Sequence, residues 1–243
     1  MIYFIGAGPG AVDLITVRGA ELLRNAGIIV YAGSLVNPEL LKAYAPENCE
    51  LHDSSGMTLA EILAVLEDGH RREILTVRLH SGDPALYGAV REQFDALRER
   101  NIPFEVVPGV SSLFAASAAL KTEYMIPGHT QTLVVSRLGG RTPAPRENPS
   151  VALFLSAGMT AQACSELIAQ GYAPETPAAV VYRASWPDER VIIGTLATLP
   201  DLAQGITKSA LILTGDFLSR EIHTASCLYD EHFSHEYRNS SIH

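Results

Sequence analysis

The chain has 243 residues, of which 47% are hydrophobic, enough for one large domain or for two lobes of about 120 residues each. Its formal net charge of −9 argues against nucleic acid as the main partner, and no stretch reaches the roughly eighteen consecutive apolar residues of a membrane span. Three scattered cysteines, Cys49, Cys164 and Cys227, form no CxxC pair and favour a reducing compartment without a disulfide framework or a zinc site. Because Met1 leads directly into an apolar run with no basic segment, we expect no signal peptide and a cytoplasmic protein.

The first expected element is a short strand followed by a glycine-rich turn. Residues 2–5 are apolar or aromatic, which is typical of a strand buried in a parallel sheet. The sequence GAGPG follows at residues 6–10, and Thr16 is placed to cap a helix over residues 17–26 that Gly27 would end. Because glycine has no Cβ, such a turn lets the backbone approach a ligand at the carboxyl end of the strand.

Two rival interpretations of this turn are weakened by the residues themselves. A dinucleotide-binding fingerprint also carries glycines after its first strand, but Pro9 removes an N–H group from a phosphate-binding loop. The second strand, expected at 28–31, ends in Ala32 and Gly33, where that fingerprint needs an acidic residue for the ribose. The second rival is a tight turn without any ligand, for which three glycines in six residues are more than the turn requires.

The rest of the first half alternates expected helices and strands. Thr58 and Glu61 are spaced as a capping box before a helix over residues 59–68, with Gly69 behind it. The pattern then predicts a strand at 74–79, a helix at 85–100, a strand at 104–107 and a helix at 113–120. Further turns follow the two strands, at 80–84 and 108–112. Since parallel strands end at a common edge of the sheet, we expect these turns to lie together where doubly wound folds bind ligands.

The second half predicts a different arrangement. Strands are expected at 132–136, 151–155, 178–182 and 191–193, and a last core strand within 207–214. A helix over residues 160–170 would end at Gly171, and Trp186-Pro187-Asp188 would form a hairpin turn. Residues 137–150 are loop by composition, and the tail from Arg220 is polar. We place the boundary near residue 120, so that an N-terminal α/β lobe spans 1–120 and a C-terminal α/β lobe with the tail spans 121–243.

Four sequence blocks occur in the order found in tetrapyrrole methylases, namely GAGPG, SGDPALYG, VVPGVSS and VVYRASWPDE. The chain resembles this family over nearly its whole length. The resemblance implies a two-lobed α/β fold with a mainly parallel N-terminal sheet, a mixed C-terminal sheet, and S-adenosylmethionine in the cleft between the lobes. It also implies a homodimer. Because a sulfonium donor needs no phosphate cradle, Pro9 is compatible with this use of the glycine turn.

Further blocks are similar to those of the family members that methylate carbon 11 of precorrin-4 in cobalamin biosynthesis. They include YAGSLV, DSSGMTLAE, IPGHTQTL, RTPAP and the tail LYDEHFSHEYR. The tail and SGDPALYG most resemble the branch whose substrate contains cobalt, whereas residues 146–150 are shorter than the helical segment usual in the family. The alternatives are another substrate of the family, such as uroporphyrinogen III, another precorrin or diphthine, a dinucleotide-dependent oxidoreductase, and a corrinoid-binding protein without activity.

The resemblance assigns binding of the methyl donor to residues within these blocks, namely Pro9, Ser81, Gly82, Asp83, Leu86, Ser111, Ser112, Ala157 and Ala184. Asp83 is the catalytic candidate, as a carboxylate directed at the donor or at a substrate nitrogen. Its alternative role is that of a turn residue before Pro84. Methyl transfer mainly requires alignment of donor and acceptor, which contributes roughly 7–11 kcal/mol, and therefore needs neither a metal nor a protein nucleophile.

Other polar residues near the turns have a structural and a functional interpretation. Four arginines lie beside the predicted turns, namely Arg78, Arg137, Arg141 and Arg183. They could pair with the carboxylates of a tetrapyrrole, although each alone is more typical of a solvated surface charge. His80, at a strand end, is either a base or a structural residue. The tail contains three histidines, His223, His232 and His235, whose spacing matches no zinc pattern, so we expect no metal.

Overall fold

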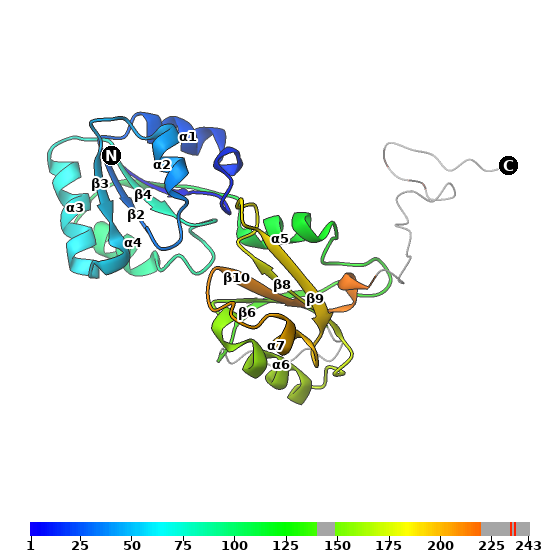
Figure 1. Ribbon diagram of the computed structural model, residues 1–243. Coiled ribbons are helices and arrows are strands. Elements are labelled where there is room, and N and C mark those ends of the chain that lie inside the picture. Colours follow the sequence, from blue (N-terminus) through cyan, green and yellow to red (C-terminus); the bar gives the residue numbers. More distant parts are fainter. Residues whose placement is uncertain (140–148, 220–233, 235, 237–243) are drawn as a thin grey trace. The chain divides into compact units, whose positions relative to one another are not determined.

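The computed structural model of the protein describes residues 1–139, 149–219, 234 and 236 (Figure 1). The chain divides into two compact units. The first comprises Met1–Ala116 and Arg183–Glu189, and the second comprises Ser117–Tyr182 and the chain from Arg190 onward. The sequence analysis places one boundary near residue 120, whereas the contacts divide the chain after Ala116 and assign the short segment Arg183–Glu189 to the first unit.

The first unit is built on a parallel five-stranded sheet, as the sequence predicts. Its strands are β1 (Ile2–Gly6), β2 (Ile28–Tyr31), β3 (Glu50–Asp53), β4 (Thr76–His80) and β5 (Phe104–Val107). They lie in the order β3-β2-β4-β1-β5, and every neighbouring pair is parallel. Gly6 pairs with His80 and Ile5 with Val107, so β1, β4 and β5 end level with one another at one edge of the sheet.

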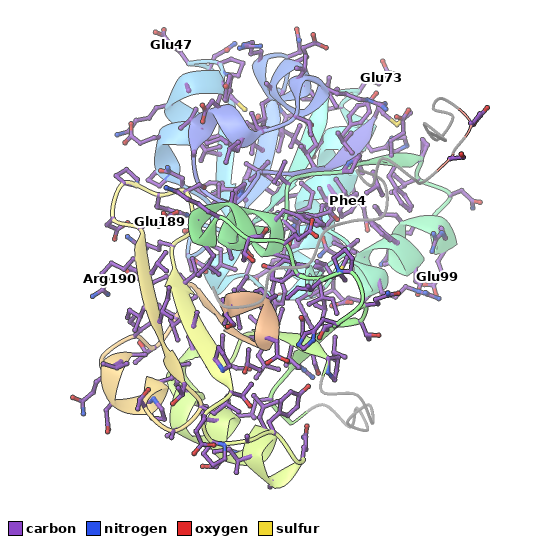
Figure 2. All side chains as sticks on the ribbon, turned by 90° about the vertical axis from the view of Figure 1, so that its right-hand side faces the viewer. Phe4, Glu47, Glu73, Glu99, Glu189 and Arg190 are labelled. Carbon is purple, nitrogen blue, oxygen red and sulfur yellow. The ribbon has the colours of Figure 1, made fainter. Side chains whose placement is uncertain are left out.

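Helices cover both faces of this sheet, which explains why its central strands β1, β2 and β4 are almost completely buried. The helices on these faces are α1 (Val17–Arg24), α2 (Pro38–Tyr44), α3 (Leu59–Arg71) and α4 (Arg91–Glu99). A fifth helix, α5 (Ser112–Leu120), follows β5 and contains the division between the units. Ile5 and Leu79 pack with α1 and α2, whereas Phe4 and Val30 pack with α3 and α4 on the opposite face (Figure 1). Figure 2 shows Phe4 surrounded by other side chains of the first unit, whereas the exposed Glu47 lies at the surface of that unit.

Two predicted helices in the first unit have the wrong bounds. The helix expected at 85–100 begins only at Arg91, because Tyr87 and Ala89 adopt positive φ angles of 57° and 48° that no helix contains. α1 ends at Arg24 with Asn25 as its C-cap, so Gly27 does not terminate it. A Cβ at Gly27 would instead stand 2.5 Å from Cγ2 of Ile74, so this glycine permits close packing.

The capping box of α3 is confirmed, but the helix does not stop before Gly69. Thr58 accepts from the N–H of Glu61, and the Glu61 carboxylate accepts from the N–H of Thr58 at 2.7 Å. α3 continues through Gly69 to Arg71, and a Cβ at Gly69 would lie 2.1 Å from the Thr76 hydroxyl oxygen. The missing side chain therefore lets α3 lie directly against β4.

The second unit contains the mixed sheet that the resemblance implies. Its strands are β6 (Leu133–Arg137), β7 (Ser150–Phe154), β8 (Pro177–Tyr182), β9 (Arg190–Thr195) and β10 (Ala210–Thr214). They lie in the order β6-β7-β10-β8-β9, with β6 parallel to β7 and the other neighbours antiparallel. The hairpin predicted around Trp186 joins β8 to β9.

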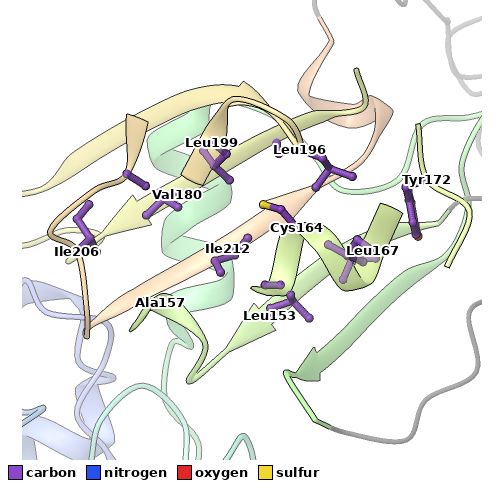
Figure 3. Close-up of a cluster of buried hydrophobic side chains, with 14 residues drawn as sticks. Leu153, Ala157, Cys164, Leu167, Tyr172, Val180, Leu196, Leu199, Ile206 and Ile212 are labelled. Atoms are coloured by element: carbon purple, nitrogen blue, oxygen red, sulfur yellow. The ribbon is translucent and has the colours of Figure 1, made fainter. Parts of the chain in front are cut away.

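Two helices, α6 (Thr160–Ala169) and α7 (Leu199–Leu202), cover one face of this second sheet. In Figure 3 the sheet residues Val180 and Ile212 face Cys164 of α6 and Leu199 of α7, and all four are buried. Gly171 follows α6 with a φ of +107° and ends the helix as the sequence predicts.

Four 3₁₀ turns complete the described part of the chain, namely η1 (Val12–Leu14), η2 (Ser54–Gly56), η3 (Ala157–Met159) and η4 (Asp216–Leu218). Within the described ranges, no helix combines the length and apolar character needed to cross a membrane. Several residues of the sequence analysis lie outside the described residues, namely Arg141, His223, Cys227, His232, His235 and the segment 146–148.

Candidate functional site

The three predicted turns meet at the carboxyl edge of the first sheet. The glycine loop, residues 6–11, is joined to the loop after β4 by a pair of backbone hydrogen bonds between Gly8 and Gly82. The N–H of Gly82 donates to the carbonyl of Gly8 at 2.8 Å, and the N–H of Gly8 donates back at 3.2 Å. One residue earlier, the N–H of Ala7 donates to the carbonyl of His80 at 2.7 Å. Beyond the parallel pairing of β1 and β4, the two loops are therefore joined by a separate antiparallel bridge.

The loop after β5 packs against these two loops through backbone alone. A Cβ at Gly109 would stand 2.2 Å from the carbonyl oxygen of Gly82 and 2.6 Å from Cα of Gly6. A Cβ at Gly6 would likewise stand 2.5 Å from Cα of Gly109. Since real Cβ contacts of this length do not occur, glycine is required at both positions. The sequence predicts that these glycines let the backbone approach a ligand. In the structure they let the backbones of the loops approach one another.

Asp83 bridges two of the loops with its carboxylate. Oδ1 accepts from the N–H of Ala85 at 2.7 Å, and Oδ2 accepts from the N–H of Gly109 at 2.8 Å. The first bond is the turn interaction that the sequence suggested as an alternative role. The second had no sequence signal and links the loop after β4 to the loop after β5. The catalytic role of Asp83 stays a prediction.

The other predicted residues of the first unit surround these contacts. Ser111 is buried, and its hydroxyl oxygen accepts from the N–H of Leu113 at 3.2 Å, which shapes the start of α5 beside Ser112. Leu86 donates its N–H to the carbonyl of Asp83 at 3.2 Å and so belongs to the same turn. Gly82 has a φ of +62°, and its Cβ position faces Cα of Ser111 at 3.5 Å. These residues, with Ser81 and Pro9, are brought together at one edge.

A segment remote in sequence covers the glycine loop, and sequence reasoning missed its role. Trp186 donates its indole N–H to the carbonyl of Pro9 at 2.9 Å, and the hydroxyl of Ser185 accepts from the N–H of Ala11 at 3.0 Å. Ala184, a predicted site residue, is buried in this same turn. On the other side, the side-chain amide of Asn37 donates to the carbonyl of Gly10 at 2.9 Å. No local pattern could have indicated contacts across more than 170 residues.

Ala157 is the predicted site residue that belongs to the second unit. It is the first residue of η3, separated from the end of β7 by two residues, and it is buried. Its carbonyl accepts from the hydroxyl of Thr160 at 2.9 Å, which leads the chain into α6. Its contact with the methyl donor stays a prediction.

Two ionisable residues of β4, Arg78 and His80, are buried rather than exposed. Arg78, expected to be typical of a surface charge, is only 5% exposed, and burial lowers its pKa to about 10. Its guanidinium donates to the side-chain oxygen of Gln93 and to the carbonyl of Val30, both at 3.2 Å. Within the described part of the chain, Nε2 of His80 is buried without a hydrogen-bond partner, and its ring stacks on Phe4 at 6.0 Å.

The environment of His80 favours the structural interpretation. Burial, and secondarily the charge of Arg78, lower the pKa of His80 to about 3, so the imidazole is neutral at physiological pH and a weak base. Of the other predicted arginines, Arg137 is exposed at the end of β6. Arg183 forms an ion pair with Asp188 at 2.8 Å.

The hydrogen bonds of the glycine loop show which ligands it can accept. The N–H groups of Ala7, Gly8 and Ala11 are all bonded within the protein, and Pro9 has none. A phosphate cradle requires several N–H groups directed at the ligand. The strand order β3-β2-β4-β1-β5 also differs from the 3-2-1-4-5 arrangement of dinucleotide-binding sheets. The edge therefore fits a ligand without phosphates, such as S-adenosylmethionine, and argues against the dinucleotide interpretation.

Comparison with known proteins agrees with this geometry. The family model of tetrapyrrole (corrin/porphyrin) methylases matches residues 1–200. A cobalt-precorrin-4 C(11)-methyltransferase of Methanocaldococcus jannaschii is 44% identical over 250 residues, covering 98% of this chain and 96% of the relative.

Two solved structures extend the comparison to the fold. A cobalt precorrin-4 methyltransferase, described as a cobalamin biosynthetic enzyme, superposes with a TM-score of 0.84 at 42% identity and covers 90% of this chain and 95% of its own. A uroporphyrin-III C-methyltransferase of Thermus thermophilus, complexed with S-adenosylhomocysteine, has a TM-score of 0.76 at 29% identity and covers 89% of this chain and 98% of its own.

Proposed function

Because the chain belongs to the tetrapyrrole (corrin/porphyrin) methylase family, we propose that it methylates carbon 11 of cobalt-precorrin-4 in cobalamin biosynthesis, with S-adenosylmethionine as the methyl donor. The observation that carries this proposal is the 44% identity, over 98% of the chain, to a relative named for that reaction. Precorrin-4 without cobalt is the second candidate substrate, since the sequence blocks of the two branches are similar.

The carboxyl edge of the first sheet supports the choice of donor. When bound, S-adenosylmethionine supplies an activated methyl group on a sulfonium cation. We propose that the backbone of the glycine loop around Pro9 and the loops at Ser81–Asp83 and Ser111–Ser112 hold it, with Leu86, Ala157 and Ala184 as further contacts. In this proposal Asp83 holds the loop after β4 and the loop after β5 in place through its hydrogen bonds with Ala85 and Gly109. Alignment of donor and acceptor is then the main contribution of the chain to the rate.

A substrate panel tests the proposal. Purified protein is incubated with S-adenosylmethionine carrying a radiolabelled methyl group and, in separate reactions, with cobalt-precorrin-4, precorrin-4 and uroporphyrinogen III. Label should enter cobalt-precorrin-4 fastest and uroporphyrinogen III at background level. Transfer to uroporphyrinogen III alone would assign the chain to another activity of the family. Calorimetric binding of NAD, without binding of S-adenosylhomocysteine, would restore the dinucleotide interpretation.

We also propose that the protein is a cytoplasmic homodimer whose small-molecule partners are the donor and a corrinoid. The dimer rests on the resemblance to the family, and the location rests on cysteine usage typical of a reducing compartment. Light scattering at protein concentrations of about ten micromolar distinguishes a dimer from a monomer. A monomeric mass at that concentration would contradict the dimer without affecting the proposed reaction.

A further inference from the structure

Trp186, the sole tryptophan of the chain, lies directly on the glycine loop. Its indole N–H donates to the carbonyl of Pro9 at 2.9 Å. A Cβ at Gly10 would stand 2.0 Å from the ring atom Cδ1 and 2.1 Å from Nε1, so the ring covers the α-carbon of Gly10. One side chain therefore contacts both the peptide before Gly10 and Gly10 itself.

The turn that carries this ring, Arg183–Glu189, is held by its own hydrogen bonds. The N–H of Trp186 donates to the carbonyl of Arg183 at 2.9 Å, and the N–H of Ser185 donates to the carboxylate of Glu189 at 2.6 Å. The guanidinium of Arg183 lies 4.8 Å from the centre of the indole ring. Because its neighbours constrain the ring, the ring can in turn constrain the loop.

The same turn also forms a hydrogen bond with the glycine loop beyond Gly10. The hydroxyl of Ser185 accepts from the N–H of Ala11, so the turn holds a carbonyl on one side of Gly10 and an N–H on the other. Asn37 fixes the carbonyl of Gly10 itself, and its own side-chain oxygen caps α2. Glycine has the largest conformational freedom to lose, so a loop with three glycines in six residues gains order mainly from such outside contacts.

We propose that Trp186 is a positioning residue for the methyl donor, because it fixes the Pro9–Gly10 backbone in the conformation that binds S-adenosylmethionine. This inference rests on the proposed function. Without the indole, the loop would have to be ordered during binding, and the cost of that ordering would be subtracted from the affinity. The turn also joins β8 to β9, so the order of the loop depends on a segment contributed by the second half of the chain.

The first arm of the test compares Trp186→Ala and Trp186→Phe with the wild type. Calorimetry with S-adenosylhomocysteine should show an affinity about tenfold lower for Trp186→Ala. Trp186→Phe should recover part of this loss, since it restores a ring over Gly10 without the N–H donor. The KM for the donor should rise by about the same factor while kcat stays within about twofold, as expected for a residue that affects binding rather than the chemical step.

The second arm is a double-mutant cycle with Gly10→Ala. The added methyl group would collide with the indole in the wild-type background, so Gly10→Ala alone should weaken binding of S-adenosylhomocysteine about tenfold or more. In the Trp186→Ala background the collision with the ring is gone and only the backbone strain of alanine at a φ of +159° remains, so the same change should have a smaller effect. Gly171→Ala is the matched control, because Gly171 also has a positive φ, of +107°, and a Cβ there meets no atom within 4 Å.

The outcomes separate this inference from the function on which it rests. If the wild type and Trp186→Ala bind S-adenosylhomocysteine equally, the positioning role is wrong and the proposed function stands. A wild type that binds no S-adenosylhomocysteine overturns the proposed function and, with it, this role. If Trp186→Ala does not fold, the test uses Trp186→Phe and Gly10→Ala instead. If both of these variants bind S-adenosylhomocysteine with wild-type affinity, the inference is overturned. Loss of hydrogen-exchange protection at the Ala11 N–H in Trp186→Ala, without any ligand, is the structural signature we expect.

Discussion

The side-chain carboxylate of Asp83 accepts a hydrogen bond from the backbone N–H of Gly109, with 2.8 Å between Oδ2 and N. Its other oxygen accepts from the N–H of Ala85 at 2.7 Å, so a single side chain ties the loop after β4 to the loop after β5. Both partners are donors, and the position therefore requires two acceptors. An aspartate supplies two acceptor oxygens, whereas an asparagine supplies one acceptor and one donor amide.

We predict that Asp83→Asn does not preserve the wild-type properties, even though asparagine readily forms the same turn. One of the two N–H groups would face the donor amide, which should lower the free energy of unfolding by about 1 kcal/mol. Turnover should fall about tenfold or more as the two loops separate. Urea denaturation and methyl-transfer assays measure both effects. Asp13→Asn, at an exposed carboxylate of the same unit, is the control, and wild-type stability and turnover in Asp83→Asn would contradict the bridging role.

The contact between the glycines predicts a sharp contrast between two alanine substitutions. In Gly109→Ala the new Cβ would stand 2.2 Å from the carbonyl oxygen of Gly82, a backbone atom that cannot rotate away. The free energy of unfolding should fall by about 1–3 kcal/mol, as for overpacked sites. Gly56→Ala places its Cβ in open space and should be neutral or slightly stabilising. Equal urea midpoints for the two variants would show that the loops are not packed as described.

The buried His80 predicts a loss of stability in acid. Its pKa falls from the ordinary value of 6.5 to about 3 in the folded protein, so below about pH 6.5 the unfolded chain binds a proton that the folded chain does not. Its contribution to stability is therefore complete above pH 6.5 and declines by about 1.4 kcal/mol per pH unit toward pH 3.

The variant His80→Leu isolates this contribution from those of the carboxylates. Between pH 7 and 4.5 the wild type should lose about 2.5 kcal/mol more free energy of unfolding than His80→Leu. His70→Gln, at a half-buried histidine in the last turn of α3, is the control for replacing a histidine elsewhere in the same unit. Parallel pH profiles for the wild type and His80→Leu would mean that His80 titrates normally in the folded protein.

The sequence predicted the parts of this fold that depend on local chemistry. The apolar run at residues 2–5, the capping box at Thr58 and the glycine after α6 each have a local physical cause, and each is found in the structure. The sequence also predicted that three loops meet at one edge of the sheet, because parallel strands end at a common edge and each of these strands is followed by a glycine turn.

The parts that the sequence did not predict depend on packing between distant segments. The sequence predicts Gly27 and Gly69 to end helices, but their missing side chains make room for Ile74 and Thr76. The hydrogen bond from the Gly109 N–H to Asp83 joins residues 26 positions apart, and the bond from the Trp186 indole to Pro9 joins residues 177 positions apart. No periodicity or turn signal specifies such pairs.

The most direct test of the central claim is to locate the transferred methyl group. Cobalt-precorrin-4 is incubated with the protein and S-adenosylmethionine carrying an isotope-labelled methyl group, and the product is examined by mass spectrometry and NMR. The proposed function predicts one new methyl group, attached to carbon 11, with one S-adenosylhomocysteine formed for each methyl transferred. A methyl group at any other carbon, or no transfer to cobalt-precorrin-4 or precorrin-4 by a protein that binds S-adenosylhomocysteine, would contradict it.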